Sequence, residues 1–479
     1  MKAIIPEFNE NSARPLYLQL YDYIKQEILS KEMSPNEKLP SLRSLAEKLK
    51  LSITTVNLAY SQLNVEGYIY SKPQSGYYVS NILQGTQSDE FNRKYEAYPM
   101  REKEYSLFPV DVEKRDESSV FQYDLSCFDF NKWKKCMNKV LTEYPQLLMF
   151  ESDPQGELAL RYEISKYIYR SRGVICNPEQ IVIGAGTQQI TSHLCLILSK
   201  LGINHVAVEE PGYLPVKNMF RDRGYVVTPV DVGKEGIHID RLPANIKSAV
   251  YVSPSNQFPT GAMMPIGKRY QLLDWATHNN SIIIEDDYDS ELRYFGKPVP
   301  ALQGLDKNQR VVYLGSFSST LFSSIKISYM VLPEKMADIF KDISHGYTQT
   351  CSKTEQLTLA LFMEQGLYQT NIKKLRNLYS QKLQKVLGSI NKYGKGFIKP
   401  ANTSSGINMI INVDSQKSAE QLCNEAKALG VSATPVCIYA DDPTGQQSAA
   451  LVFYYNQIPL NQIENTIQSL IEKWTAFED

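Results

Sequence analysis

The sequence predicts a multidomain chain in which a small α+β unit at the N-terminus is followed by a large α/β body. In the first eighty residues, helical periodicity gives way to two short β-rich runs around a turn. From Phe121 onward, short β-branched runs alternate with helical patterns, which is typical of a sheet covered by helices. A length of 479 residues with 43% hydrophobic content allows two or three domains, each with its own core.

The N-terminal unit begins with a predicted amphipathic helix in the stretch RPLYLQLYDYIKQEILSKEM. Two shorter helices follow, and Ser41 and Ser52 stand where their N-caps are expected. The apolar side chains of the first helix recur every three to four residues, at Leu16, Leu20, Tyr23, Ile24 and Ile28.

The shorter helices meet at a tight turn around Leu51, and the next run, IYSKPQSGYYVS, predicts a small hairpin. Three helices and a hairpin in this order form a winged helix-turn-helix. In such a unit the last helix presents its N-terminal side chains to the major groove of DNA. The sequence therefore predicts a DNA-binding domain, and the alternative is a protein-interaction module of the same pattern.

The charge of the chain neither demands nor excludes nucleic acid. The formal net charge is −1, and residues 1–80 hold nine Lys and Arg against eight Asp and Glu, a balance of +1. DNA affinity would therefore depend on two copies acting together, since tethered heads gain from effective concentration.

The pattern of cysteines, histidines and apolar runs argues against several classes of protein. Seven cysteines are scattered without a C-x-x-C spacing, and five histidines are dispersed, so neither a disulfide framework nor a metal site is expected. The N-terminal MKAIIPEFNE lacks the apolar core of a signal peptide, and no run of about 18 apolar residues occurs. We expect a soluble, cytoplasmic protein without a metal.

Residues 81–118 are polar and lack sustained periodicity, which predicts a linker. In the body we expect strands at QIVIGAG, HVAVEEP, SAVYVSP, SIIIEDD and VVYLGSF, in a mostly parallel sheet with helices on both faces. Ligands in such sheets lie at the carboxyl ends of the strands. GAGTQQ opens a helix there and suits a phosphate, but Gln189 stands where a dinucleotide-binding motif needs its third glycine.

Together these motifs resemble a known family. LPSLRSLAEKLKLSITTVNLAYSQLNVEGY with SGYYV resembles the GntR family of bacterial regulators, and GAGTQQ, VEEPGY, SPSNQFPTGAMMP, IIIEDDYDSELRY and GSFS resemble the fold type I aminotransferases. The whole chain is similar to the MocR/GabR subfamily, which joins the two. The resemblance implies a head at 10–80, the linker at 81–118, and an aminotransferase-like body at 119–479. The body would consist of a large part at about 155–345 and a smaller α+β subdomain at about 346–479.

The resemblance implies roles for residues of the head. Ile53 departs from the family pattern, because the family has an arginine there. The residues expected to touch DNA are Arg43, Ser52, Thr54, Thr55 and Gly76.

In the body, the resemblance implies a site for pyridoxal 5′-phosphate. A carboxylate beside the ring nitrogen keeps that nitrogen protonated, and the protonated ring acts as the electron sink. The residues implied are Gly186, Thr187, Gln188 and Ser316 at the phosphate, Tyr213 stacked on the ring, Asp286 at the ring nitrogen, and Asn256 and Tyr288 at the phenolic oxygen.

Three positions depart from the family pattern in ways that change chemistry. Ser319 stands where the family has the lysine that forms the Schiff base, and a hydroxyl cannot form an imine. Lys326 stands where an arginine lies near the phosphate, which keeps the charge but loses the bidentate fork. Leu451 aligns with the arginine that grips an amino-acid carboxylate.

Three interpretations follow. The chain is a regulator whose degenerate, non-catalytic body serves dimerisation and ligand sensing, or a regulator that still binds pyridoxal 5′-phosphate noncovalently or through Lys326, or a working aminotransferase. The first is favoured and the last is the least favoured. The resemblance also implies a double-stranded DNA operator, a homodimer with exchanged heads, and a small-molecule effector whose identity the sequence does not give.

Overall fold

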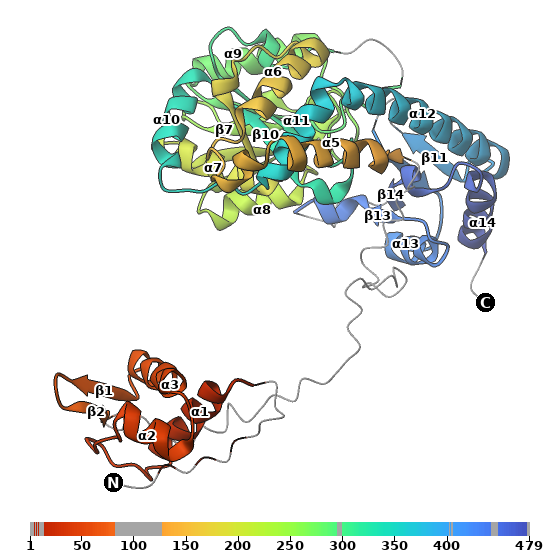
Figure 1. Cartoon of the computed structure of the whole chain (residues 1–479). Helices are drawn as coiled ribbons and strands as arrows, with labels where there is room; N and C mark the ends of the chain where they lie inside the picture. Colours follow the sequence, from red (N-terminus) through yellow and green to blue (C-terminus); the bar gives the residue numbers. More distant parts are fainter. Residues whose placement is uncertain are drawn as a thin grey trace. The chain divides into compact units, whose positions relative to one another are not determined.

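The computed structural model describes residues 4, 6, 8, 14–81, 127–294, 299–401, 403, 406–441 and 449–476. The chain forms two compact units, Met1–Val110 and Asp111–Asp479, each described here by itself (Figure 1). The predicted linker at 81–118 lies outside the described residues, apart from Asn81.

The N-terminal unit has the element order of a winged helix-turn-helix. The predicted N-caps are confirmed: the Ser41 hydroxyl accepts from the backbone N–H of Ser44 at 3.2 Å, and the Ser52 hydroxyl accepts from that of Thr55 at 3.0 Å. The two strands pair as an antiparallel hairpin. The elements are α1 (Leu16–Leu29), α2 (Leu42–Leu49), α3 (Ile53–Val65), β1 (Ile69–Lys72) and β2 (Gly76–Val79).

The core of this unit is built from the predicted apolar stripes. Leu20 and Ile24 of α1 and Val56 and Leu63 of α3 are completely buried in one cluster. The α1 helix therefore packs on the helix that would enter the DNA groove and holds it in place.

The C-terminal unit is built on a mixed, mostly parallel eight-stranded sheet in the order β3-β10-β9-β8-β7-β4-β5-β6. Strand β10 is antiparallel to β3 and β9, β6 is antiparallel to β5, and the other pairs are parallel. The strands are β3 (Ile181–Ala185), β4 (His205–Glu210), β5 (Val226–Gly233), β6 (Gly236–Ile237), β7 (Ala249–Val252), β8 (Ile282–Asp286), β9 (Val311–Ser316) and β10 (Ile327–Val331).

Both faces of this sheet are buried under helices. Successive side chains of a strand point to opposite faces, so they join different clusters of the core. In β8, Ile282 and Ile284 join the cluster under α7, α8 and α10, whereas Ile283 joins the cluster under α9. Helices α5, α6 and α11 cover the β3–β10 end of that second face (Figure 1). These helices are α5 (Phe130–Glu143), α6 (Leu158–Arg172), α7 (Thr187–Lys200), α8 (Leu214–Asp222), α9 (Ile266–His278), α10 (Glu334–Ser344) and α11 (Lys353–Glu364).

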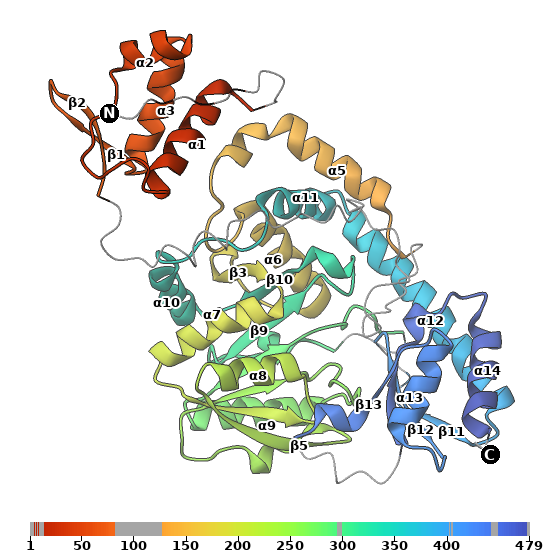
Figure 2. The ribbon, with the colours of Figure 1, turned by 90° about the horizontal axis from the view of Figure 1, so that it is seen from below.

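A smaller antiparallel sheet in the order β11-β12-β14-β13 forms a second layer at one end of this unit, shown in blue in Figure 2. It carries its own core with α13, α14 and much of α12. Helix α11, in contrast, packs in the core of the large sheet, and the boundary at about 346 stays a prediction. The elements are α12 (Leu367–Tyr393), β11 (Ile398–Ala401), β12 (Met409–Val413), α13 (Ala419–Ala428), β13 (Ala433–Pro435), β14 (Ala449–Phe453) and α14 (Ile463–Thr475).

Short 3-10 helices connect several of these elements. They are η3 (Pro145–Met149), η4 (Pro178–Gln180), η5 (Ile239–Arg241), η6 (Gln303–Leu305), η7 (Ser323–Ile325), η8 (Val436–Tyr439) and η10 (Tyr455–Gln457).

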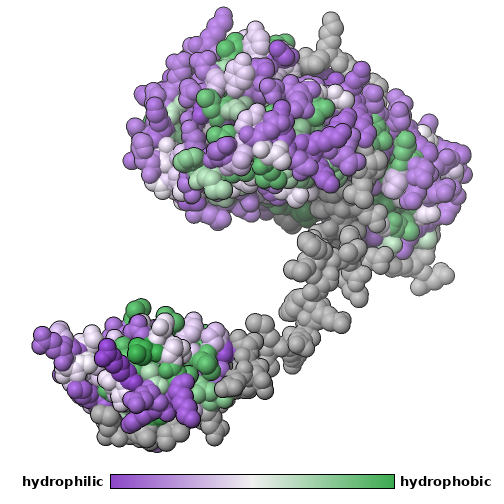
Figure 3. Space-filling model, viewed as in Figure 1, coloured by the Kyte–Doolittle hydropathy of each residue, from purple (hydrophilic) through white to green (hydrophobic). Residues whose placement is uncertain are grey.

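Among the described residues, no helix is long and apolar enough to span a bilayer, and no group of three acidic, His or Cys side chains is placed to hold a metal. None of the seven cysteines forms a disulfide. In the face drawn in Figure 3, hydrophilic residues dominate the surface of the C-terminal unit, with hydrophobic ones scattered among them.

Candidate functional site

A cavity of about 230 Å³ lies at the carboxyl ends of β8 and β9, next to the N-terminus of α7. This is the edge at which the sequence predicted a ligand. The described residues that line it are Thr187, Tyr213, Phe258, Asp286, Tyr288, Asp289, Ser316, Ser318, Ser319, Ile407, Asn408 and Tyr454. Six of the ten predicted cofactor residues are therefore brought together in one wall.

Asp286 is the last residue of β8 and the first acid of the cavity. Its carboxylate accepts a hydrogen bond from the hydroxyl of Tyr251 on the adjacent strand β7. Burial raises the pKa of Asp286 to about 7, the Tyr251 hydrogen bond lowers it, and the neighbouring carboxylates of Asp287 and Asp289 raise it further. Asp286 thus titrates near neutral pH unless a donor or a positive charge lies beside it.

The next residue, Asp287, belongs to a different network. Arg172 of α6 donates to its carboxylate from Nε at 2.6 Å and from Nη2 at 3.1 Å, and the Tyr313 hydroxyl donates at 2.6 Å. Arg172 also donates to Ser255 Oγ at 2.5 Å, in the loop after β7. Asp287 is therefore neutralised within the fold, whereas Asp286 faces the cavity.

Asp289 is the second acid of the cavity, and Ser319 is its polar neighbour. Its side chain is 3% exposed, its backbone has φ of +56°, and one carboxylate oxygen, Oδ1, has no hydrogen-bond partner among the described residues. Burial raises the pKa of Asp289 to about 6, and a hydrogen bond with the Ser319 side chain lowers it. The residue at the expected lysine position thus contacts a carboxylate.

Hydroxyl groups and a helix N-terminus also line the cavity. Gly186 caps α7 with φ of +86°, in the region that favours glycine, and Thr187 begins the helix. Ser316 Oγ accepts from Ser328 Oγ at 3.0 Å, and Ser318 follows Ser316 in the wall. Free N–H groups of a helix start together with hydroxyls suit the phosphate of a ligand.

Aromatic rings form the sides of the cavity. The rings of Tyr213 and Phe258 lie edge to face at 6.1 Å, and those of Phe258 and Tyr288 at 6.2 Å. Asn256 Nδ2 donates to the Tyr288 hydroxyl at 3.5 Å. Tyr213 is 39% exposed, so a flat ligand can reach its face.

A segment of the smaller layer closes the cavity. The carbonyl of Gly406 accepts hydrogen bonds from the hydroxyls of Tyr294 and Tyr455, each at 2.6 Å. Gly406 has φ of +83°, and a Cβ there would lie 3.1 Å from Asn256 Nδ2, so glycine permits the close approach. This contact brings Ile407 and Asn408 into the wall.

Four of the predicted cofactor residues lie outside this lining. Gly186 precedes Thr187, Asn256 lies behind Tyr288, and Gln188 and Lys326 are exposed. Leu451, aligned with the carboxylate-gripping arginine, is completely buried in the core of the smaller layer. No Lys, Arg or His occurs among the described residues of the lining.

Sequence reasoning missed half of the wall. Phe258, Asp289 and Ser318 lie within quoted motifs, one or two residues from positions that were chosen, so their motifs were the available signal. Tyr454 lies outside the quoted motifs. Ile407 and Asn408 belong to no motif, and only the docking of Gly406 places them at the site.

These residues fit pyridoxal 5′-phosphate as a bound group, but they do not fit its covalent attachment. The α7 start with Thr187 and Ser316 suits the phosphate, and Asp286 suits the ring nitrogen. The polar group at the expected lysine position is the Ser319 hydroxyl, which forms no imine.

In the N-terminal unit, the predicted DNA-contacting residues surround the start of α3 and the hairpin. Arg43, Ser52, Thr54 and Gly76 are exposed. The Thr55 hydroxyl is 2.8 Å from that of Ser52, so these two are engaged in capping the helix.

Two lysines that sequence reasoning did not single out lie near the hairpin, Lys72 in β1 and Lys38 in the segment before α2. Lys72 Nζ lies 4.7 Å and Lys38 Nζ 5.9 Å from the centroid of the Tyr78 ring. The Tyr70 and Tyr78 rings stack at 5.8 Å. Two ammonium groups thus lie near the ring of Tyr78, on the strand that begins at the exposed Gly76.

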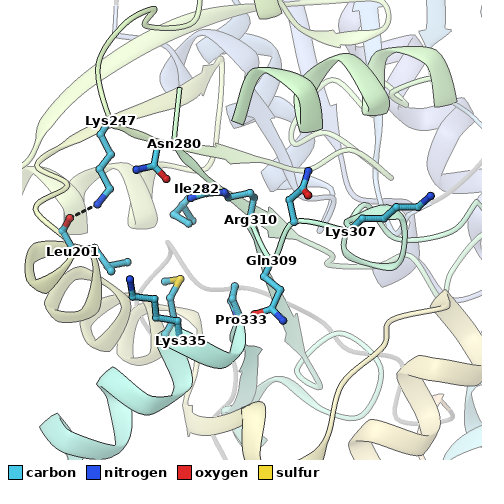
Figure 4. Close-up of a pocket in the computed structure, with 11 residues that line it drawn as sticks. Leu201, Lys247, Asn280, Ile282, Lys307, Gln309, Arg310, Pro333 and Lys335 are labelled. Atoms are coloured by element: carbon cyan, nitrogen blue, oxygen red, sulfur yellow. Dashed lines mark hydrogen bonds between the residues drawn. The ribbon is translucent and has the colours of Figure 1, made fainter. Parts of the chain in front are cut away.

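A second cavity, of about 400 Å³, lies at the opposite edge of the sheet, where β8 and β9 begin (Figure 4). Its described lining contains four cations and no acid, and Figure 4 shows Lys247 donating to the carbonyl of Leu201. The cations are Lys247, Lys307, Arg310 and Lys335. It shares no residue with the candidate site, whose charged lining residues are both acids.

Comparisons with known proteins agree with this architecture. Residues 16–79 match the family described as "Bacterial regulatory proteins, gntR family", and residues 121–439 match "Aminotransferase class I and II". The chain is 38% identical to the uncharacterized HTH-type transcriptional regulator YdeL of Bacillus subtilis (strain 168), over 91% of this chain and 92% of that protein. It is 29% identical to the probable rhizopine catabolism regulatory protein MocR of Rhizobium meliloti, over 97% and 94%.

Among solved structures, the multiple substrate aminotransferase of Thermococcus profundus superposes with a TM-score of 0.64. It is 21% identical and covers 74% of this chain and 89% of its own, so the likeness concerns the fold. The predicted union of a GntR-type head and a fold type I aminotransferase-like body is confirmed.

We expect Asp286→Asn to make stability less sensitive to pH. The folded carboxyl keeps its proton up to about pH 7, whereas the ordinary value is 3.8. Between these values the folded state binds more protons, so this group lowers wild-type stability as pH rises, by up to about 4 kcal/mol. Urea denaturation at about pH 4 and pH 7.5 measures the difference. Asp274→Asn, at an exposed position, is the control. If the free energy of unfolding changes equally between the two pH values in Asp286→Asn and in the wild type, the raised pKa of Asp286 is contradicted.

Proposed function

The chain belongs to the aminotransferase class I and II family and carries a gntR-family head, and on that premise we propose that it is a DNA-binding transcriptional regulator with a non-catalytic, ligand-sensing body. The observation that carries this proposal is the wall of the cavity. It keeps Thr187, Asp286 and Ser316, but it has Ser319 where the chemistry needs an amine.

The printed names of the relatives and the surface of the head support DNA binding. YdeL and MocR are both named as regulators. Arg43 of α2 and Thr54 of α3 would contact DNA. Lys38, before α2, and Lys72, on the hairpin, would neutralise phosphates. Because the overall charge is −1, this contact depends on local cations and on two heads acting together.

Transamination needs an amine base to move a proton, and the described wall of the cavity offers none. When bound, pyridoxal 5′-phosphate supplies an electron sink. Thr187, Ser316 and Ser318 would hold its phosphate, Tyr213 its ring and Asp286 its ring nitrogen. These residues bind and orient a ligand, but the Ser319 hydroxyl neither attaches it nor shuttles its proton.

Two other functions have less support. Attachment of the cofactor through Lys326 would require this lysine to enter the cavity, whereas its side chain is exposed and its backbone has φ of +48°. A working aminotransferase would also need a carboxylate-binding cation, and Leu451 is buried at the aligned position.

Exposed apolar side chains on the C-terminal unit support a homodimer. They cluster along the chain from α5 through η3 to α6, and Met149 and Phe150 are 82% and 71% exposed. Such concentrations of apolar residues are typical of surfaces that another chain covers. The residues are Leu141, Tyr144, Leu147, Met149, Phe150, Leu158 and Tyr162.

A ligand in the cavity would contact both layers of the body, since Asp286 comes from the large sheet and Ile407 and Tyr454 from the smaller part. Binding would therefore shift the smaller part against the larger one. Such a shift regulates DNA binding only if the ligand has different affinities for the two arrangements.

We expect Arg43→Ala to weaken binding of a duplex selected by the wild-type protein from a random-sequence library by roughly 5-fold to 100-fold. Lys72→Ala should weaken binding of all duplexes alike and reduce the dependence on salt, because it removes a phosphate contact. Fluorescence anisotropy measures both. Arg170→Ala, at an exposed arginine of α6, is the control, and the head has another role if Arg43→Ala binds as Arg170→Ala does.

We expect Met149→Asp with Phe150→Asp to convert a dimer into a monomer, because two charges on the apolar surface would be buried on association. Light scattering during size-exclusion chromatography measures the mass. Val65→Asp, at an apolar position of the head that is 86% exposed, should leave the mass unchanged. A dimer that survives the double substitution would place the interface elsewhere.

We expect borohydride reduction with pyridoxal 5′-phosphate to leave the wild-type protein without a specific adduct. Ser319→Lys should acquire one on the peptide that contains residue 319, because it restores an amine to the wall. Ser319→Gln has comparable bulk and no amine, and it should remain unmodified. Intact mass and peptide mapping provide the readout, and a wild-type adduct at Lys326 would establish the attachment argued against above.

A further inference from the structure

The cavity has an unusual balance of charge for a site built around a phosphorylated ligand. Its charged lining residues are Asp286 and Asp289, with no cation in the described wall. The resemblance implies an amine at the position of Ser319, and the hydroxyl that stands there brings no positive charge to Asp289.

The carboxylate of Asp289 has too few hydrogen-bond donors around it among the described residues. It is 3% exposed, Ser319 is the side chain that hydrogen-bonds it, and Oδ1 has no partner among the described residues. An unpaired, buried carboxylate oxygen costs free energy, which a ligand donor would recover.

Besides the Ser319 hydroxyl, the groups that interact electrostatically with Asp289 are acids or neutral rings. Asp286 and Glu291 flank it in the same loop, and each would repel a second negative charge. Four tyrosines also interact electrostatically with Asp289. They are Tyr288, Tyr294, Tyr454 and Tyr455. None of these supplies a positive charge.

A primary ammonium group meets these conditions better than a carbonyl group. It has three donors and a positive charge, so it can pair with Asp289 Oδ1 and the Ser319 hydroxyl at once. The aromatic wall also favours a cation, through the negative faces of its rings. An aldehyde oxygen only accepts hydrogen bonds, and beside a carboxylate it is repelled.

We propose that the cavity takes its ligand in the amine form, and that it binds pyridoxamine 5′-phosphate in preference to pyridoxal 5′-phosphate through Asp289 and Ser319. The phosphate would lie at the α7 start with Thr187 and Ser316, the end that both forms share. This inference rests on the proposed sensing function of the cavity, and it names the chemical class that the cavity senses.

Isothermal titration of the full-length protein at about pH 8, where Asp289 is ionised, tests the preference. We expect pyridoxamine 5′-phosphate to bind at least about 10-fold more tightly than pyridoxal 5′-phosphate or 4-deoxypyridoxine 5′-phosphate, which has neither amine nor aldehyde. Asp289→Asn should remove most of this preference. Asparagine tolerates a positive φ, so the substitution keeps the backbone. Ser319→Lys should reverse the preference, because the added ammonium occupies Asp289 and repels the ligand amine.

Equal or tighter binding of the aldehyde by the wild type would overturn the inference, as would an unchanged ratio in Asp289→Asn. Binding of none of the three ligands would also overturn it. In each case the proposed regulator is judged separately by the DNA-binding assay, so failure of the preference and failure of the regulatory function are distinguishable.

Discussion

The buried ion pair between Arg172 and Asp287 fixes the geometry on which the candidate site depends. Arg172 joins helix α6 to the end of β8 and also donates to Ser255, in the loop after β7. Because adjacent residues of a strand point to opposite faces, securing Asp287 on one side presents Asp286 to the cavity on the other. A pair this deeply buried is costly to break, since either partner alone would be an uncompensated charge.

The fold does not require the chemistry of its relatives. The sheet, the strand that ends in Asp286 and the hydroxyls near α7 are held by apolar packing and by hydrogen bonds in which a lysine has no part. We therefore propose that Ser319, at the position where the resemblance implies an amine, changes what the cavity can bind while its wall keeps its shape. A regulator gains from this arrangement, because a ligand that is bound and released unchanged can report its own concentration.

Sequence reasoning predicted the parts of the site that follow from local rules. Periodicity predicted the strand ends and the helix start at GAGTQQ, whereas the roles of Thr187, Asp286 and Ser316 came from the family resemblance. Asp289 was missed because its orientation depends on a left-handed backbone conformation that the sequence pattern does not predict. Asn408 was missed because it reaches the cavity through the docking of Gly406, which is distant in the sequence. Lys72 was missed because its contact with the ring of Tyr78 joins two strands and is made only in the folded hairpin. The roles of all these residues stay predictions, whereas the union of head and body is confirmed.

The central claim is that occupancy of the cavity is transmitted to the heads on DNA. DNase footprinting of the full-length protein on a selected operator, with and without saturating pyridoxamine 5′-phosphate and with pyridoxal 5′-phosphate in parallel, tests it most directly. We expect the ligand to change the protection of at least one half-site, since the two arrangements of the dimer would differ in the spacing of their heads. Protection that stays the same at both half-sites, with the ligand shown to be bound, would contradict the claim.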